Sequence, residues 1–471
     1  MKKVFILGLM MSVWFTSNAQ IGGLKNKLKD KASSAVSGKK SSKSTSSSSG
    51  SKTSNSTSAS TSSSSAKTVK GKDYYISPSG SGKEASKENP AKDLAVIIMQ
   101  LQDGDVVHIA AGTYTSKLGR GSDVINKSVS IIGGYSPDFS TRDPWGKYKT
   151  IFTGTNDYNK GLTTSRLRIN GNPSAPVLID GIIVDNGPRN RYKTEKHQLI
   201  LRKANPSKGE NPTPETPGIK ILMSGEGTSV TIQNCIVMNT APTQGAIDVQ
   251  IGKNSKAVIR NNLIVNNTGE GIMAKTNWHG ETPENFATYI IENNTILFNW
   301  KHDAIASYGG NSLMMDTRVK LIAKNNIFGF GDFGGVNNIK KCQNLELINN
   351  NFFGHKSYDF FDTAPMSVAD MADYAEYVKK AQGNVSEPVK LPLNPDWAAL
   401  YASRKEISRA EVDASSTVSN STENQVRSIL GLNLQGSSVS TDADIWLHQM
   451  QVEDAVKLGL NQYNGRGCSK P

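Results

Sequence analysis

Four short segments place charged and aromatic side chains where they could bind a sugar acid. Residues 219–222, 247–250, 272–275 and 305–308 each begin with Ile, and their first and third members are apolar or small. In an extended strand, successive side chains point to opposite faces, so those members would face a core. The outward-facing polar and aromatic members are then Lys220, Asp248, Gln250, Lys275 and Tyr308.

The segments beside these strands add two histidines, two arginines, a tryptophan and an aspartate: His279, His302, Arg189, Arg191, Trp278 and Asp303. An aromatic ring can stack on a sugar ring, and Lys or Arg can pair with a uronate carboxylate. β-Elimination also needs a base beside the neutralised carboxylate. The candidate base is Lys275, with His279 and His302 as further catalytic candidates. Lys220, Arg189 or Arg191 would hold the carboxylate. Alternatively, these residues are only the polar outer face of a sheet.

A repeated phrase indicates the elements that position these residues. An apolar strand interrupted by Asn-Asn, or once by Asn-Cys, returns five times between Val230 and Phe353. Its first Asn falls at positions 234, 261, 293, 325 and 350, which gives spacings of 27, 32, 32 and 25 residues. Self-similarity at such a period predicts stacked structural units.

The Asn-Asn pair predicts a tight bend between two strands, because Asn tolerates the left-handed backbone conformation. Coils stacked at strand spacing would place each Asn above the previous one. Their side-chain amides could then hydrogen-bond in a ladder and satisfy one another.

This pattern resembles the right-handed parallel β-helix of the pectin-lyase-like superfamily, whose three-strand coils carry an Asn ladder at the second turn. The resemblance covers residues 73–362 and implies an all-β fold. It also implies a ligand groove on the first strand of each coil, which is where the four segments align. The folded part begins with a strand, a helix, an Asp103-Gly104 turn and then Gly112-Thr-Tyr114. This order resembles the N-terminal part of many secreted β-helix proteins, including polysaccharide lyases.

The chain departs from the hydrolases and calcium-dependent lyases of that superfamily. Hydrolysis needs paired carboxylates at the bond, and the sequence contains no Asp-Asp, Asn-Thr-Asp or Gly-His-Gly. A calcium site needs clustered carboxylates, and the aligned strands offer Asp248 with Asp303 nearby. The sequence therefore predicts no metal ligands and leaves a calcium cofactor open.

The charge of +13 lies mainly outside the predicted coils. Residues 1–19 read as a secretory signal peptide, with Lys2 and Lys3 before an apolar run that is too short to span a membrane. Residues 20–72 form a Ser/Lys-rich linker with a net charge of +10, which leaves +1 for residues 73–471. A nearly neutral body argues against nucleic-acid binding. The linker is either a flexible spacer or a basic segment that grips an anionic polymer.

Further elements are predicted around the coils. A capping helix is expected over residues 90–101, and residues 187–217 are expected to be a long loop with a strand at 199–201. Residues 363–471 would cap and cover the stack, with helices near 367–383 and 441–459. Cys235, Cys342 and Cys468 do not form a disulfide framework and are expected to be buried.

These observations predict an exported, monomeric β-helix protein in the periplasm, on the cell surface or outside the cell. Its expected partner is an acidic polysaccharide or cell-surface glycan, with cleavage by β-elimination as an additional activity. The alternative is a non-catalytic adhesin or structural protein whose coils form a stiff rod.

Overall fold

The computed structural model describes residues 71–116, 122–154, 165–171, 175–186, 217–240, 242, 244–277, 286–300, 309–371, 378–392 and 450–471. It also describes the backbone of residues 192–195 and 198–201. The predicted signal peptide and linker lie outside these residues. None of the described helices is long and apolar enough to cross a membrane.

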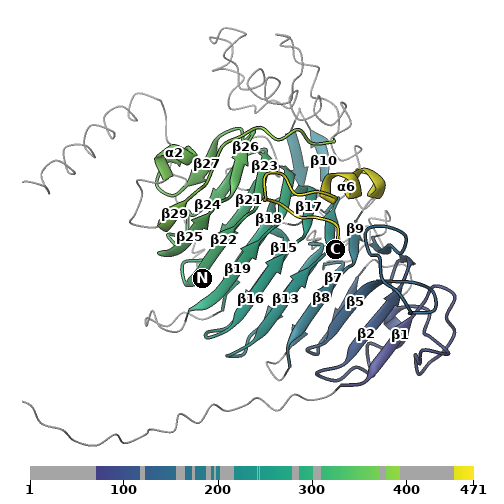
Figure 1. Cartoon of the computed structure of the whole chain (residues 1–471). Coiled ribbons are helices and arrows are strands. Elements are labelled where there is room, and N and C mark those ends of the chain that lie inside the picture. Colours follow the sequence, from purple (N-terminus) through teal and green to yellow (C-terminus); the bar gives the residue numbers. More distant parts are fainter. Residues whose placement is uncertain are drawn as a thin grey trace, which may run out of the picture. The chain divides into compact units, whose positions relative to one another are not determined.

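Three long sheets of parallel strands make up the fold (Figure 1). Sheet A contains β1 (Asp73–Ile76), β2 (Val106–Ala110), β5 (Ser130–Tyr135), β8 (Val177–Asp180), β13 (Ser229–Gln233), β16 (Lys256–Arg260), β19 (Ala287–Glu292), β22 (Val319–Lys324), β25 (Asn344–Ile348) and β29 (Val378–Gln382). Sheet B contains β3 (Gly112–Tyr114), β6 (Thr150–Thr153), β9 (Ile183–Asp185), β14 (Ile236–Met238), β17 (Leu263–Thr268), β20 (Thr295–Trp300), β23 (Ile327–Gly331) and β26 (Asn351–Phe353). Sheet C contains β4 (Asp123–Ile125), β7 (Leu167–Gly171), β12 (Ile219–Met223), β15 (Gly245–Ile251), β18 (Glu270–Thr276), β21 (Asn311–Met315), β24 (Gly334–Asn337), β27 (Tyr358–Phe361) and the antiparallel β28 (Pro365–Met366).

The chain visits the sheets in the order C, A, B and then returns to C. Strands β12, β13 and β14 form one coil, and β15, β16 and β17 form the next coil in register above it. The alternating apolar residues of all three sheets point into one shared core. The predicted all-β parallel β-helix is confirmed, and its last strand in sheet A is β29.

The Asn-Asn bend between sheets A and B has the predicted left-handed backbone. The first residue of each bend has a positive φ of 51° to 56°: Asn234, Asn261, Asn293, Asn325 and Asn349. The fifth prediction, Asn350, is therefore wrong by one residue. The true bend is Asn349, and the spacing from Asn325 is 24 residues. The run Asn349-Asn-Asn351 allows either alignment from sequence alone.

From the second bend onward, the second residue is a buried Asn, and these residues form an amide ladder. The first bend has Cys235 at this position, and its backbone N–H donates to Oδ1 of Asn262 at 3.0 Å. Asn262 donates through Nδ2 to Oδ1 of Asn294, which donates to Asn326 in the same way, at 3.0 Å in both contacts. Asn326 donates to Asn350 at 2.9 Å, and Asn350 donates to Asn384 at 3.0 Å. The ladder thus ties consecutive coils together at one buried corner, as predicted.

A second asparagine stack lies between sheets B and C, and the sequence analysis did not predict it. Asn266 donates to Oδ1 of Asn239, and Asn239 donates to Oδ1 of Asp185, at 2.7 Å in both contacts. The indole of Trp300 continues the stack by donating to Oδ1 of Asn266 at 2.7 Å. Two of the three corners of the β-helix are therefore held by side-chain amides.

The predicted N-terminal helix is shorter than expected. Only Leu94–Val96 is helical, as the 3₁₀ helix η1. The segment around Pro90 pairs instead with β1, where Ala91 donates its N–H to Tyr75 and accepts from Ser77. The predicted apolar face still packs inward, because Leu94, Ile97 and Leu101 are buried.

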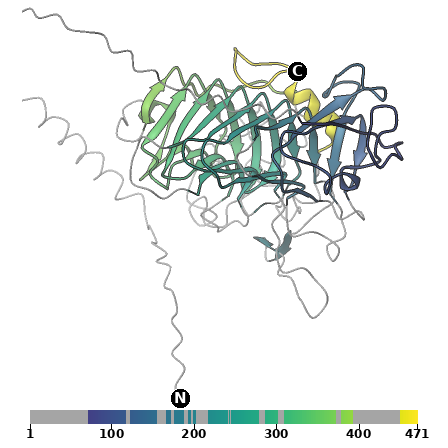
Figure 2. The same ribbon diagram turned by 90° about the horizontal axis from the view of Figure 1, so that it is seen from below.

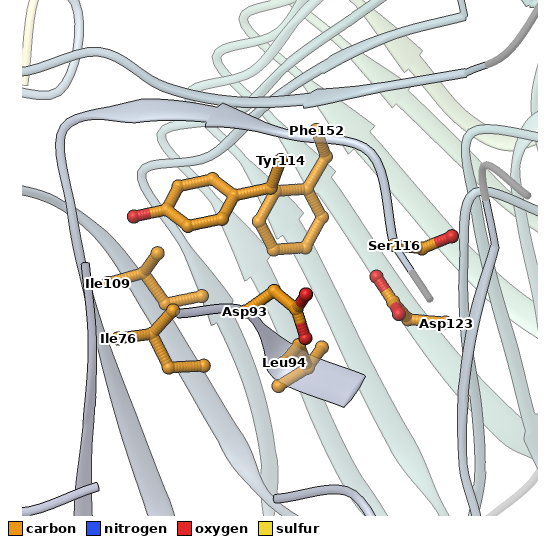
Figure 3. Close-up of a pocket in the computed structure, with 8 residues that line it drawn as sticks. All are labelled: Ile76, Asp93, Leu94, Ile109, Tyr114, Ser116, Asp123 and Phe152. Atoms are coloured by element: carbon orange, nitrogen blue, oxygen red, sulfur yellow. The ribbon is translucent and has the colours of Figure 1, made fainter. Parts of the chain in front are cut away.

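Beside η1, the first coils close around a buried ion pair. Figure 3 shows the carboxyl groups of Asp93 and Asp123 near the rings of Tyr114 and Phe152. Arg166 is fully buried, lies 2.6 Å from Asp123 and also donates to the carbonyls of Tyr114 and Thr153. These acceptors compensate the buried charge of the guanidinium. Because they come from three different segments, Arg166 holds the first coils together.

The C-terminal residues cover sheet B. Helix α6 (Val452–Gly459) packs on β14 and β17, as the yellow helix of Figure 2 shows. The tail after it pairs with the bend asparagines: Ser469 exchanges hydrogen bonds with Asn261 at 2.8 and 3.0 Å, and Arg466 donates to Asn349 at 2.7 Å. The helix begins later than predicted, because Gln451 is extended; residues 441–449 lie outside the described residues.

The helix predicted over residues 367–383 is present at its start and wrong at its end, and residues 372–377 lie outside the described residues. The capping pair of Ser367 and Asp370 is present, but helix α2 is described only for Val368–Met371. Val378–Gln382 is the strand β29, because it pairs with the open edge of β25. Exposed Lys379 and Lys380 on β29 protect the edge of sheet A from pairing with another chain.

The long segment after β9 contains a small hairpin. Strands β10 (Tyr192–Glu195) and β11 (Gln198–Leu201) pair antiparallel, and β11 includes the predicted strand at 199–201. The three cysteines are free and buried, as expected. Burial raises the pKa of the Cys235 and Cys468 thiols to about 12.

Replacing one ladder residue should destabilise the fold. Asn326→Ala would leave the N–H groups of Asn294 and the carbonyl of Ile291 without their partner. We expect a loss of about 2–4 kcal/mol in the free energy of unfolding, measured by urea denaturation. The control is Gln100→Ala, which removes an exposed carboxamide bonded to the carbonyl of Lys83 and should cost less than about 1 kcal/mol. Equal losses in both variants would contradict a stabilising ladder.

Candidate functional site

The outer face of sheet C carries the predicted site strands, and three of the four are aligned as expected. Lys220 lies opposite Asp248, and Gln250 lies opposite Lys275. The fourth alignment is wrong, because β18 pairs with β21 and not with residues 305–308. Beyond β21, Asp316 donates its N–H to the carbonyl of Ala274 and takes the position that was predicted for Tyr308.

Lys220, Asp248 and Lys275 form an ion cluster across three neighbouring strands. The Asp248 carboxylate is fully buried and lies 2.6 Å from Nζ of Lys275 and 3.4 Å from Nζ of Lys220. Among the described residues, its oxygens have no other hydrogen-bond partner. Removing one lysine would therefore leave a buried charge poorly compensated.

Two further groups fix Lys275. Its ammonium group also donates to the side-chain carbonyl of Gln244. Below the strand, the Tyr289 hydroxyl reaches from sheet A through the core, accepts from the N–H of Lys275 at 3.2 Å and lies 2.9 Å from the carbonyl of Val249. Burial raises the pKa of Tyr289 well above its usual value, so the hydroxyl remains a neutral hydrogen-bonding group. Lys275 is therefore held from both faces of the sheet.

An open groove of about 530 Å³ lies beside this cluster on the same face. Its lining comes from β7, β12 and β15 and from the residues that follow β4, β12 and β18: Asn126, Arg168, Asn170, Gly171, Leu222, Met223, Ser224, Gln250 and Asn277. The strands place one guanidinium, four carboxamides and a half-buried leucine around the space.

Arg168 is a charged residue of the groove lining that the sequence analysis missed. It lies opposite Lys220 in the register of β7 and β12, and its Nε donates to Oδ1 of Asn170 at 2.8 Å. Asn170 in turn donates to Oδ1 of Asn126 at 3.0 Å. The alternation of Leu167-Arg-Ile-Asn170 matches that of Ile219-Lys-Ile-Leu222 and would have revealed it. No Asn-Asn phrase follows β7, so the alignment began one coil too late.

Asp316 adds a carboxyl group next to Lys275. Its Oδ2 accepts from the N–H of Thr276 at 3.3 Å. Burial raises the pKa of Asp316, and the Asp248 charge adds to this effect, while Lys340 and Lys275 oppose it. Lys275 thus lies between the carboxyl groups of two neighbouring strands.

The other predicted site residues lie outside the described residues: His279, His302, Trp278, Tyr308, Asp303, Arg189 and Arg191. Two histidines are described, and neither lines the groove. His108 lies on the outer face of sheet A between Asp73 and Tyr135, and His355 is buried with its pKa lowered to about 3. Within the described ranges, no three His, Cys, Asp or Glu side chains form a metal-binding group.

Glu270 is the first residue of β18, and its carboxyl group is buried. It accepts from the backbone N–H groups of Gly309 and Asn311 at 3.1 and 3.0 Å. Burial raises its pKa from 4.5 to about 7, against the effect of these hydrogen bonds. Because Asn311 also accepts from the Tyr358 hydroxyl at 2.7 Å, Glu270 anchors the start of β21 to the neighbouring coils.

The similarity of this chain to known proteins is distant. No protein-family model and no curated protein matches the sequence. The chain is similar to the crystal structure of pectate lyase Pel9A, with 14% identity and a TM-score of 0.24 over 57% of this chain and 77% of that chain. It is also similar to a rhamnogalacturonan lyase, with 13% identity and a TM-score of 0.24 over 69% of this chain and 65% of that chain, slightly less than two thirds of its length. Both proteins are lyases by name, and the likeness carries no argument about this chain's activity.

The raised pKa of Glu270 predicts a pH dependence of stability. The folded chain keeps the Glu270 proton at pH values where the unfolded chain has released it. This stabilisation is complete below pH 4.5 and is lost as the pH rises to about 7, by at most about 3 kcal/mol. Glu270→Gln should remove this decline in urea denaturation measured across that range. If Glu270→Gln keeps the full decline in the free energy of unfolding, other titrating groups cause it.

Proposed function

We propose that the outer face of sheet C binds an acidic polysaccharide, with Arg168 pairing with a uronate carboxylate. The observation that supports this proposal is the open groove with a guanidinium in its lining. Apart from its bond to Asn170, Arg168 has no hydrogen-bond or ion-pair partner among the described residues. Guanidinium groups bind carboxylates through paired N–H donors, so this side chain suits a sugar acid.

The remaining lining fits the neutral parts of a sugar chain. Carboxamides both donate and accept hydrogen bonds, as sugar hydroxyls do. Leu222 is half-buried between Asn170 and Gln250 in the same column and offers an apolar surface to the C–H groups of a sugar ring. A site of this kind combines a few polar groups with an apolar floor.

The ion cluster supports anion binding at longer range. Arg168, Lys220 and Lys275 face the carboxyl groups of Asp248 and Asp316, which leaves one more cation than carboxyl group at the groove and its cluster. This charge would attract a polyanion and weaken as salt is added. An extracellular polymer as ligand also agrees with the signal peptide predicted at residues 1–19, so we place the protein outside the cytoplasm.

The second candidate function is cleavage of the bound polymer by β-elimination, with Lys275 as the base. Unprotonated Nζ of Lys275 would take the proton beside the carboxylate, the electron pair would form the new C=C bond, and the glycosidic oxygen would leave with a proton from an acid. The observation that favours it is the position of Lys275, which lies opposite the groove-lining Gln250 in the register of β15 and β18. Asp316 is a carboxyl group on the next strand that could supply the proton.

Arg168→Ala should weaken polysaccharide binding by about 10- to 100-fold, because it removes a charge-assisted contact. Retention on a panel of acidic polysaccharides, measured by affinity electrophoresis, tests this expectation. The matched control is Arg260→Ala, an exposed arginine on the outer face of sheet A that bonds Gln233. Equal retention of the Arg168 and Arg260 variants would count against this groove.

The elimination step is tested by ultraviolet absorbance of the unsaturated uronate product. We expect wild-type protein to generate this signal on a bound polymer, with and without calcium, and Lys275→Ala to lose it by at least about 100-fold. The control is Lys324→Ala, which breaks an ion pair with Glu292 on sheet A and should retain activity. Binding without any product would leave a non-catalytic binding protein; absence of both would favour a structural role.

A further inference from the structure

Among the described residues, the lining of the groove contains few charges, and this indicates which ligand the described part of the groove suits. Among the described residues that line it, only Arg168 has a charged side chain. The other polar side chains of the lining are the four carboxamides and Ser224. One guanidinium can neutralise one carboxylate, so the number of sugar acids in contact with the groove is limited.

The nearby lysines do not add independent carboxylate sites. Nζ of Lys275 is 2.6 Å from the buried Asp248 carboxylate and also donates to Gln244. Lys220 lies 3.4 Å from the same carboxylate, and the two lysine side chains are only 12% and 15% exposed. A ligand carboxylate that displaced either ammonium group would leave Asp248 with a single partner. The cluster therefore attracts anions without offering one cation for each carboxylate.

The carboxamides favour hydroxyl groups over additional carboxylates. Asn170 uses Oδ1 for Arg168 and one N–H for Asn126, and Asn277 uses one N–H for the carbonyl of Ser224. Each amide nitrogen carries a second N–H, and each oxygen has a second lone pair. A hydroxyl can both donate to such an oxygen and accept from such a nitrogen. A carboxylate can only accept, and it is repelled by the amide oxygens.

We propose, on the basis of the proposed binding function, that the ligand is a heteropolysaccharide in which single uronic acid units are separated by neutral sugars. One uronate carboxylate pairs with Arg168. Neutral units lie over Leu222 and the carboxamides of Asn170 and Gln250. A polymer made only of uronic acids places further carboxylates over groups that cannot neutralise them.

The test compares oligosaccharides of equal length that bind the full chain. One series has a single uronate flanked by neutral sugars, one contains only uronates, and one contains only neutral sugars. We expect the first series to bind at least about tenfold more tightly than the other two. The slope of log affinity against log salt concentration should correspond to about one ion pair. Arg168→Gln should remove that salt dependence.

A second variant tests whether the charge count sets this preference. Asp248→Asn releases both lysines from their counter-ion, so preference should shift by about tenfold towards the series that contains only uronates. Glu292→Gln, which removes the partner of Lys324 on sheet A, should leave the preference unchanged.

The outcomes separate this inference from the proposed function. Tighter wild-type binding of the series that contains only uronates would overturn the heteropolysaccharide while retaining an acidic ligand. Equal binding of acidic and neutral series would overturn both. If Asp248→Asn does not fold, the ranking of the three series by the wild-type protein decides the question.

Discussion

The amide ladder between sheets A and B is the interaction on which the rest of the structure depends. Each asparagine from Asn262 to Asn350 bonds its counterpart in the next coil, so these coils are fixed at strand spacing at one corner. The backbone N–H of Cys235 joins the preceding coil to the ladder by donating to Asn262. Coils of 24 to 32 residues therefore remain in register. Differences in coil length are absorbed by the turns, and Lys220, Asp248 and Met273 can form one straight column across sheet C.

This constraint also determines how charges meet on the outer face. Side chains of a parallel stack lie directly beside those of the neighbouring coils, so a charge is compensated by the coil before or after it. Asp248 has a lysine on the strand at either side, and Lys275 has a carboxyl group at either side. Arg168 lies at the end of its column, beyond Lys220, where the groove is open.

The repeat was predictable because a left-handed bend followed by a buried amide leaves few residue choices besides Asn. Prediction failed where this constraint is weak. Three consecutive asparagines at 349–351 allow two alignments, and the coil of β7 carries Asp180-Gly181 in place of Asn-Asn, which concealed Arg168. The strand next to β18 was misplaced because the true strand, β21, reads Asn-Ser-Leu-Met-Met and lacks the alternation that marks the other three segments. Val378–Gln382 has helical periodicity, but the open edge of β25 makes it a strand.

Buried ion pairs alone do not identify the functional face. Arg166 and Asp123 near the N-terminal coils, and Lys356 and Asp332 near the last coils, are as deeply buried as Asp248. Arg166 is saturated by backbone carbonyls and closes the core, so its charge is unavailable to a ligand. Sheet C differs because its ion cluster adjoins an open groove, and among the described residues the guanidinium in that groove bonds only Asn170. This combination of compensated charges behind the groove and a guanidinium within it is why we propose this face for binding.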